Sequence, residues 1–208
     1  DGITVQGLRR SYEGVAQMPA GSKCIEFIDN DAQDDGGGET PVPDGPGYFL
    51  VTNLADITTG EYVIAANVDG NYYAMSNSFA SKIDGASITV NNGMISLDAA
   101  NSYVVTITKN GDNYTIYSGS ISKYLTYVSS TNLGKQDSGY DWNIASGTNG
   151  TFRVTSTAST TRGIVYRDNN TYHQFGGYAV SNATASSEEY FDIELFKKNN
   201  RTDSGEGD

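Results

Sequence analysis

The sequence predicts an all-β fold, a β-trefoil of three pseudo-repeats, with a short two-stranded segment in front of it. A glycine followed by an aromatic-x-aliphatic strand recurs at residues 60–64, 111–116 and 150–154. A second apolar strand follows each of these, at residues 73–75, 124–125 and 163–165. A strand of the form bulky-x-Ile then closes each unit, at residues 105–107, 142–144 and 191–193. Because no single unit can bury its own apolar face, three copies indicate one repetitive domain over residues 48–197.

Residues 1–30 precede this domain and are predicted to form two strands, one at residues 3–8 and one at residues 22–28. Two strands alone are only marginally stable in water. We therefore expect this segment to dock on the main domain, to pair with another chain, or to be the end of a larger domain. Residues 31–47 are acidic and rich in Gly and Pro, which is typical of a linker. A calcium-loop interpretation is disfavoured because Val42 stands where the bidentate Glu of such a loop is needed.

Turn signals divide the main domain. Asn110-Gly111 and Asn149-Gly150 are predicted hairpin turns at the repeat boundaries, because both residue types tolerate positive φ. The first repeat is the longest, and its insertion at residues 88–97 is predicted to be a hairpin with its turn at Asn92-Gly93. No amphipathic helix is predicted. Residues 198–208 are predicted to be a polar tail.

Composition excludes several classes of function. The net charge of −12 argues against a nucleic-acid partner, which usually requires a basic stripe. No apolar run is long enough for direct membrane insertion. Cys24 is the single cysteine, so no internal disulfide forms, as in a reducing compartment or in an exported bacterial protein without disulfides. A lipid-attachment role for Cys24 is disfavoured against a small buried hydrophobe, because Lys23 precedes it where a small residue is required.

The sequence lacks the combinations of residues that catalysis usually requires. A nucleophile needs an adjacent base, and the one histidine, His173, lies in a turn-like segment far in sequence from Cys24. One His and one Cys cannot build a zinc site. A glycosidase carboxylate pair is disfavoured, because Glu188 and Glu189 are adjacent and a strand would point them to opposite faces. We therefore predict no enzyme activity, no catalytic residue, no metal and no cofactor.

Ligand binding fits the composition better, since 15 tyrosines combine large rings with polar hydroxyls. The candidate ligand-binding residues lie in or beside loops between predicted strands. They are Tyr127, Tyr166, Asp168, Asn169, Tyr172 and His173. The alternative is that these tyrosines only cap the core with their hydroxyls in water. Trp142, the only tryptophan, is predicted to be a core residue.

The main domain resembles known families of β-trefoil domains. Residues 48–197 resemble the ricin-type β-trefoil, with Trp142 in the strand of its Gln-x-Trp motif but Tyr140 in place of the Gln. The domain also resembles trefoil-like modules on secreted and surface proteins of gut Bacteroidetes. The segments that carry this second resemblance are residues 60–64, 162–166, 175–178 and 191–197.

Residues 3–28 resemble the last strands of an OB-fold-like domain that often precedes such modules. OB folds bind oligonucleotides or oligosaccharides, but an incomplete barrel is expected to bind neither. Both resemblances imply export, and neither implies a catalytic residue.

The predicted function is a non-catalytic extracellular binding module for a glycan, as part of a larger bacterial cell-surface protein. The first alternative is a structural or protein-interaction domain of a surface lipoprotein, with a surface protein as its partner. The second alternative is an accessory domain of a glycan-degrading enzyme.

Overall fold

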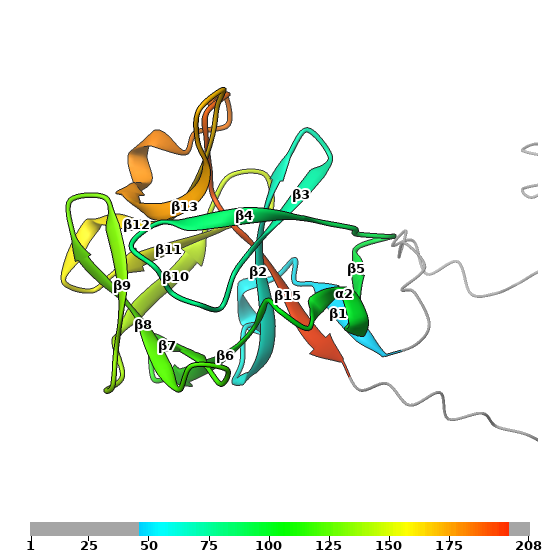
Figure 1. The fold of residues 1–208 in the computed structure, drawn as a ribbon, viewed down its shortest axis with the longest axis horizontal. Helices are drawn as coiled ribbons and strands as arrows, with labels where there is room; N and C mark the ends of the chain where they lie inside the picture. Colours follow the sequence, from blue (N-terminus) through cyan, green and yellow to red (C-terminus); the bar gives the residue numbers. More distant parts are fainter. Residues whose placement is uncertain (1–45, 200–208) are drawn as a thin grey trace, which may run out of the picture. The chain divides into compact units, whose positions relative to one another are not determined.

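The computed structural model describes residues 46–199, which form an antiparallel all-β domain (Figure 1). The two strands predicted in residues 1–30, most of the predicted linker and residues 200–208 lie outside the described residues. The strands of residues 46–199 confirm the prediction of an all-β main domain. No helix within residues 46–199 has the length and apolar character needed to cross a membrane.

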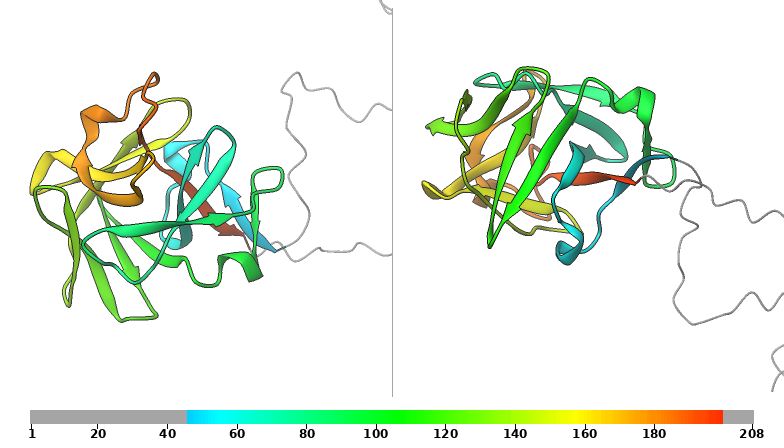
Figure 2. Two further views of the ribbon diagram at one scale, coloured as in Figure 1. Left: turned by 45° about the horizontal axis from the view of Figure 1, so that its top comes forward. Right: turned by 90° about the horizontal axis from the view of Figure 1, so that it is seen from below.

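Six strands pair in a closed circuit. In order, they are β2 (Gly60–Val68), β6 (Val104–Asn110), β7 (Asn113–Ser118), β10 (Trp142–Ser146), β11 (Phe152–Ser156) and β15 (Glu194–Asn199). Each pairs with the next in antiparallel register as far as β11, and β15 pairs with β2. The circuit closes where Phe152 of β11 exchanges two backbone hydrogen bonds with Ile193, the residue directly before β15. The strands curve around a common interior in every view (Figures 1 and 2).

Three hairpins extend from this circuit. They are β3 (Asn71–Met75) with β4 (Ile83–Ile88), β8 (Lys123–Ser129) with β9 (Asn132–Gln136), and β12 (Ser159–Asp168) with β13 (His173–Ala179). The hairpins also contact one another. β13 pairs with β4, and the backbone N–H of Gly177 donates to the carbonyl of Thr131, at 2.8 Å, in the turn between β8 and β9. The loops at the hairpin ends are therefore anchored on neighbouring hairpins.

The remaining elements are short. They are β1 (Gly47–Leu50), β5 (Met94–Ser96), β14 (Tyr190–Phe191), α2 (Leu97–Ala100) and two short 3₁₀ helices, Leu54–Asp56 and Val180–Asn182. The α2 helix is a single turn, and the Ser96 hydroxyl caps it by accepting from the Ala99 N–H.

The core fills the inside of the circuit with one large apolar cluster. Its members come from all three predicted repeats, for example Tyr62, Trp142 and Phe152, each fully or almost fully buried. Trp142 is therefore a core residue, as predicted. Its indole N–H donates to the carbonyl of Leu125 at 3.1 Å, so its one polar group is satisfied inside the core.

Every segment predicted as a strand in residues 46–199 lies wholly or partly in a strand or bridge. The predicted turn at Asn149-Gly150 is confirmed, since these residues have φ of 52° and 81°. The turn at Asn110-Gly111 is displaced by one residue. Asn110 still belongs to β6 and pairs with Asn113, and only Gly111, at φ 62°, is left-handed.

The insertion at residues 88–97 turns where predicted but pairs differently. Asn92 and Gly93 both have positive φ, and Asn91 and Met94 exchange hydrogen bonds across the turn. The strand that follows, β5, pairs with β1 rather than folding back on residues 88–90. The prediction of a simple hairpin was therefore wrong, because the edge of β1 provides a partner that is remote in sequence.

The last strand also differs from the prediction. The predicted strand at residues 191–193 is interrupted at Asp192, whose side chain turns inward toward Arg153. β15 then runs to Asn199, so Lys198 and Asn199 pair with β1 and do not belong to a free tail.

Candidate functional site

The tip of the β12–β13 hairpin brings together four of the predicted ligand-binding residues. Asp168 and His173 face each other at the end of the strand ladder, and the His173 Nδ1 and an Asp168 carboxylate oxygen are hydrogen-bonded. Asn169 shapes the loop between them, because its Oδ1 accepts from the N–H groups of Thr171 and Tyr172 at 2.9 and 2.8 Å. The loop is therefore held by its own side chains.

Tyr172 is the most exposed aromatic residue at this tip, with 42% of its surface accessible. Its ring lies over the guanidinium of Arg167, whose central carbon is 4.5 Å from the ring centre. The Arg167 Nε donates to Glu189 at 2.6 Å, and Asn169 Nδ2 donates to the same carboxylate oxygen at 2.6 Å. The hydrogen bond from Arg167 lowers the pKa of Glu189. The tip thus combines an exposed ring with a fixed polar network.

Tyr166, which was predicted to lie in or beside a loop, lies inside β12 and away from this surface. Its side chain is 0% exposed, and it packs between Tyr73 and Phe175, at centroid distances of 5.4 and 4.7 Å. A Cβ at position 85 would lie 2.6 Å from its ring, so Gly85 makes room for it. Burial raises the pKa of Tyr166, and its hydroxyl has no hydrogen-bond partner among the described residues. The Tyr166 ring is therefore part of the core.

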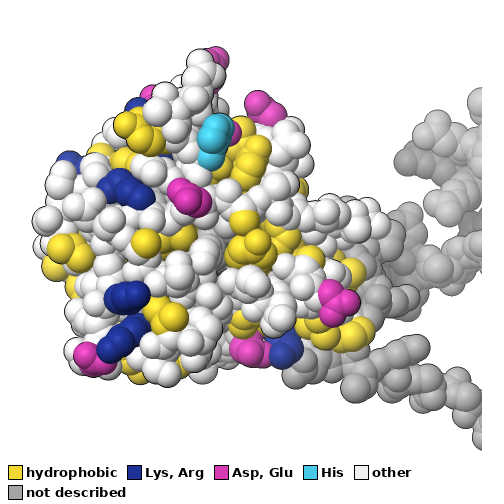
Figure 3. All heavy atoms as spheres, in the orientation of Figure 1, with side chains coloured by type: hydrophobic (Ala, Val, Ile, Leu, Met, Phe, Trp, Pro, Cys, Tyr) yellow, Lys and Arg dark blue, Asp and Glu magenta, His cyan; other side chains and the backbone are white. Residues whose placement is uncertain are grey.

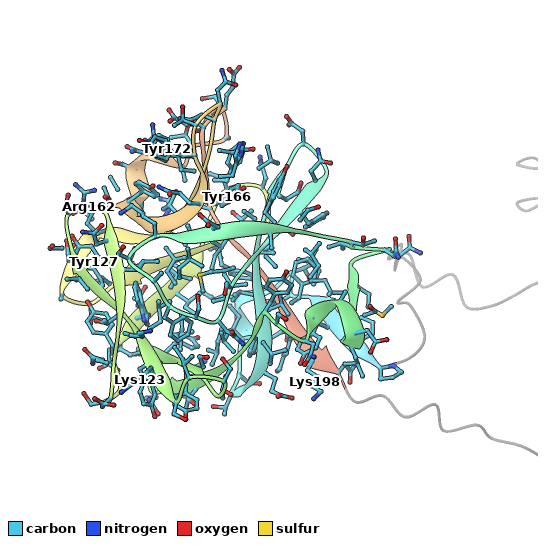
Figure 4. All side chains as sticks on the ribbon, in the orientation of Figure 1. Lys123, Tyr127, Arg162, Tyr166, Tyr172 and Lys198 are labelled. Atoms are coloured by element: carbon cyan, nitrogen blue, oxygen red, sulfur yellow. The ribbon has the colours of Figure 1, made fainter. Side chains whose placement is uncertain are left out.

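Tyr127 comes from a different hairpin than Tyr172; both are labelled in Figure 4. It is half-buried on β8, and its hydroxyl donates to the carbonyl of Ser130 at 3.2 Å. A Cβ at Gly177 would lie 2.8 Å from its ring, so the ring packs closely on β13. The structure therefore does not bring Tyr127 into the cluster at the hairpin tip.

A cleft of about 270 Å³ lies next to this hairpin. It was not predicted from the sequence. Three segments that are distant in sequence line it: the β2–β3 turn, the β10–β11 turn and residues 184–194. We call it the acidic cleft. Its lining residues are Asn67, Asp69, Thr148, Asn149, Thr151, Thr184, Ala185, Ser187, Tyr190, Phe191, Asp192 and Glu194.

Asp192 forms part of the cleft wall and is fixed by Arg153. The guanidinium of Arg153 donates to both carboxylate oxygens of Asp192, at 3.0 and 3.3 Å, and also to the carbonyl of Ala183 at 2.9 Å. The Asp192 side chain is 1% exposed, so its charge is compensated by Arg153 rather than by water. Gly147 permits this arrangement, because a Cβ there would lie 2.9 Å from Asp192.

Glu194 is the second buried carboxylate that lines the cleft. The residue is 9% exposed, and burial raises its pKa. Its Oε1 accepts a long hydrogen bond of 3.4 Å from Asn67, whereas its Oε2 has no partner among the described residues. Such an unpaired buried oxygen is costly, because it has lost water without gaining another donor.

Tyr190 connects the cleft with the hairpin tip. It lines the cleft, its ring packs edge-to-face on Tyr178 at 5.6 Å, and Arg167 lies 5.5 Å from its centre. Because Arg167 also contacts Tyr172, the exposed tip and the cleft share one supporting residue. The predicted site residues at the tip are therefore neighbours of the cleft, although they do not line it.

A wider hollow of about 530 Å³ lies over β1 and the end of β15. The two lysines that line it already have partners. Lys197 donates to the carbonyl of Asp56 at 3.1 Å and to the Thr58 hydroxyl, and Lys198 is paired with Glu61. These lysines have structural roles, so the acidic cleft is the better candidate site.

The acidic cleft offers several groups for hydrogen bonding. Its two inner carboxylates, Asp192 and Glu194, are almost entirely buried, so neither presents an accessible base or nucleophile. Within residues 46–199, no group of three or more His, Cys, Asp or Glu side chains is arranged to hold a metal ion. Lys and Arg side chains are dispersed over the face drawn in Figure 3, without a continuous basic patch there. Comparison of the chain with models of protein families and with curated proteins found no match.

Proposed function

We propose that this chain carries a non-catalytic carbohydrate-binding module with a β-trefoil fold. The closed circuit of six strands and its three hairpins support the trefoil, because they divide into three similar units. Each unit has one circuit strand, a hairpin and a second circuit strand or bridge: β2 to β6, β7 to β10, and β11 to β15. Three such units of similar plan are what the repeats in the sequence predict.

The observation that carries the proposed function is the chemistry of the acidic cleft. Amide, hydroxyl and carboxylate groups line it together with the rings of Tyr190 and Phe191. A sugar presents many hydroxyl groups around an apolar ring face, so it needs such polar partners beside an aromatic surface. Pockets that combine apolar surface with a few fixed polar groups are the usual sites for small ligands.

The size of the cleft indicates a small ligand unit. Its volume of about 270 Å³ lies below the range of roughly 300–1,000 Å³ that is common for pockets holding drug-sized ligands. We therefore propose that it holds a terminal sugar, with Tyr172 and the hairpin tip contacting the next part of the glycan. Affinity at one such site is weak, and several linked copies would provide useful retention.

The proposed context is an exported module of a larger cell-surface protein. The resemblance to modules of gut Bacteroidetes supports this context. The net charge of −12 disfavours a polyanionic partner such as nucleic acid.

A glycan-array screen of the purified full chain, with host mucin and plant polysaccharide fragments, tests the proposal. We expect a reproducible, saturable hit. A clean negative on folded protein would contradict the proposal and would favour the interaction-domain alternative, for which a pull-down of surface proteins is the next experiment.

A further inference from the structure

All the charged residues that line the acidic cleft are negative. Three carboxylates line it, those of Asp69, Asp192 and Glu194, and no Lys or Arg is among its lining residues. Arg153, which pairs with the lining residue Asp192, is already engaged by that carboxylate and by the carbonyl of Ala183. A ligand in the cleft therefore meets uncompensated negative charge from the other two carboxylates.

Glu194 is the main source of this uncompensated charge when it is ionised. It is nine-tenths buried, its Oε2 has no partner among the described residues, and the one hydrogen bond of its carboxylate to these residues is the long one from Asn67. Asp69 adds an exposed charge at the cleft rim and makes no ion pair within residues 46–199. Water screens a buried carboxylate poorly, so its field extends into the cleft.

We propose that the acidic cleft selects sugars that carry a primary ammonium group over neutral and anionic sugars. This inference rests on the proposed function, since it specifies the class of glycan for the same cleft. The ammonium group of such a sugar is a positively charged partner for the carboxylates of Glu194 and Asp69, which have none within residues 46–199. Its N–H groups also find acceptors among the surrounding hydroxyl and amide oxygens of Thr148, Asn149 and Ser187.

Anionic sugars are disfavoured by the same argument. A uronic acid or a sulfated sugar would place a negative charge beside the two uncompensated carboxylates, and like charges in a poorly screened site repel. A neutral sugar forms the hydrogen bonds but leaves the charge of the cleft uncompensated. The expected order of affinity is therefore amino sugar, then neutral sugar, then acidic sugar.

The test is a titration of the full chain with four probes, followed by NMR or calorimetry, at a pH where the sugar amine is protonated and Glu194 is ionised. The probes are glucosamine, glucose, glucuronic acid and ethanolamine. We expect glucosamine to bind at least about tenfold more tightly than glucose, glucuronic acid to bind more weakly than glucose, and ethanolamine to bind much more weakly than glucosamine.

Two variants test which residues supply the selectivity. Glu194→Gln should bring the affinity for glucosamine close to that for glucose. Asp69→Asn, at an exposed turn position whose φ of 50° Asn also tolerates, should reduce the preference severalfold without affecting the fold. The matched control is Asp112→Asn, at an exposed turn outside the cleft, which should leave the preference unchanged.

The outcomes separate the two proposals. Equal binding of glucose and glucosamine, or tighter binding of glucuronic acid, overturns the inference but leaves carbohydrate binding intact. Ethanolamine as tight as glucosamine also overturns it, because the site would then recognise an amine without the sugar. No binding of these sugars or of any array glycan contradicts the proposed function itself, and the inference with it.

Discussion

Arg153 and Asp192 form a buried ion pair that joins β11 to the break between β14 and β15. Two hydrogen bonds, of 3.0 and 3.3 Å, connect the guanidinium to the carboxylate, whose side chain is 1% exposed. The pair explains why the last strand is interrupted at Asp192, since the side chain has turned inward to reach Arg153. It also fixes one wall of the acidic cleft.

Arg153→Ala should lower the free energy of unfolding by about 3 kcal/mol, because it leaves the Asp192 charge buried without a partner. This value is at the low end for a broken buried pair, since 32% of the Arg153 side chain is exposed. Urea denaturation measures the loss. Lys123→Ala is the control, because its partner Asp137 is 89% exposed and the pair should contribute no more than about 1 kcal/mol. Equal losses in both variants would contradict this account.

Tyr166→Phe should stabilise the domain by about 1 kcal/mol, because it removes a buried hydroxyl that lacks a partner among the described residues. Tyr62→Phe is the matched comparison in the same core. The Tyr62 hydroxyl donates to the carbonyl of Thr58 at 2.6 Å and accepts from its N–H at 3.1 Å, so its loss should destabilise by about 1 kcal/mol. Thermal denaturation of both variants measures the difference. A destabilised Tyr166→Phe variant would show that its hydroxyl does have a partner.

Much of the fold could be predicted from the sequence, because strand and turn signals are local. Trp142 was predicted to be a core residue and is buried, and Asn149-Gly150 was predicted to be a turn and has positive φ. The pairing of β5 with β1 was not predictable in this way, because nothing near residues 94–96 identifies a partner so far back in the chain.

The candidate site was harder to predict, for two physical reasons. Tyr166 was predicted to lie in or beside a loop, but β12 continues to Asp168, and both faces of the strand are buried at residues 163–166. The acidic cleft is assembled from three distant segments, so no local motif identifies it. The dipeptide Asp69-Gly70 is typical of a hairpin turn and could have predicted one of the three segments, since these residues have φ of 50° and 85°.

Gly150→Ala should destabilise the domain by about 1–2 kcal/mol, because alanine is strained at the φ of 81° that this turn requires. An added Cβ would meet no atom within 4 Å, so the cost comes from the backbone alone. Gly119→Ala is the control, since Gly119 has equally open space and no positive φ. It should be neutral or stabilising by up to about 1 kcal/mol. Chemical denaturation of the two variants distinguishes these effects, and equal changes would contradict the assigned turn.

Glu194 should make stability decrease as the pH rises above the ordinary range of a glutamate. Burial raises the pKa of Glu194 above its usual value of 4.5, so the folded protein holds this proton more tightly than the unfolded chain. The resulting stabilisation is complete below the unfolded pKa and is lost as the pH rises through the folded pKa.

Glu194→Gln cannot titrate, so the difference between wild type and variant isolates this effect. As the pH rises above the usual glutamate pKa of 4.5, the wild type should lose unfolding free energy relative to Glu194→Gln. Urea titrations at several pH values measure this difference. A constant difference over the whole range would show that Glu194 has the same pKa in both states.

The most direct test of the account is to locate a bound glycan by NMR. Amide chemical shifts of the full chain are followed during titration with the best array ligand. We predict saturable shifts that concentrate at the acidic cleft, on Asn67, Asn149 and Tyr190, with smaller shifts at Tyr172 on the hairpin tip. Saturable binding that leaves the amides of the cleft unchanged would contradict the assignment of the cleft as the binding site.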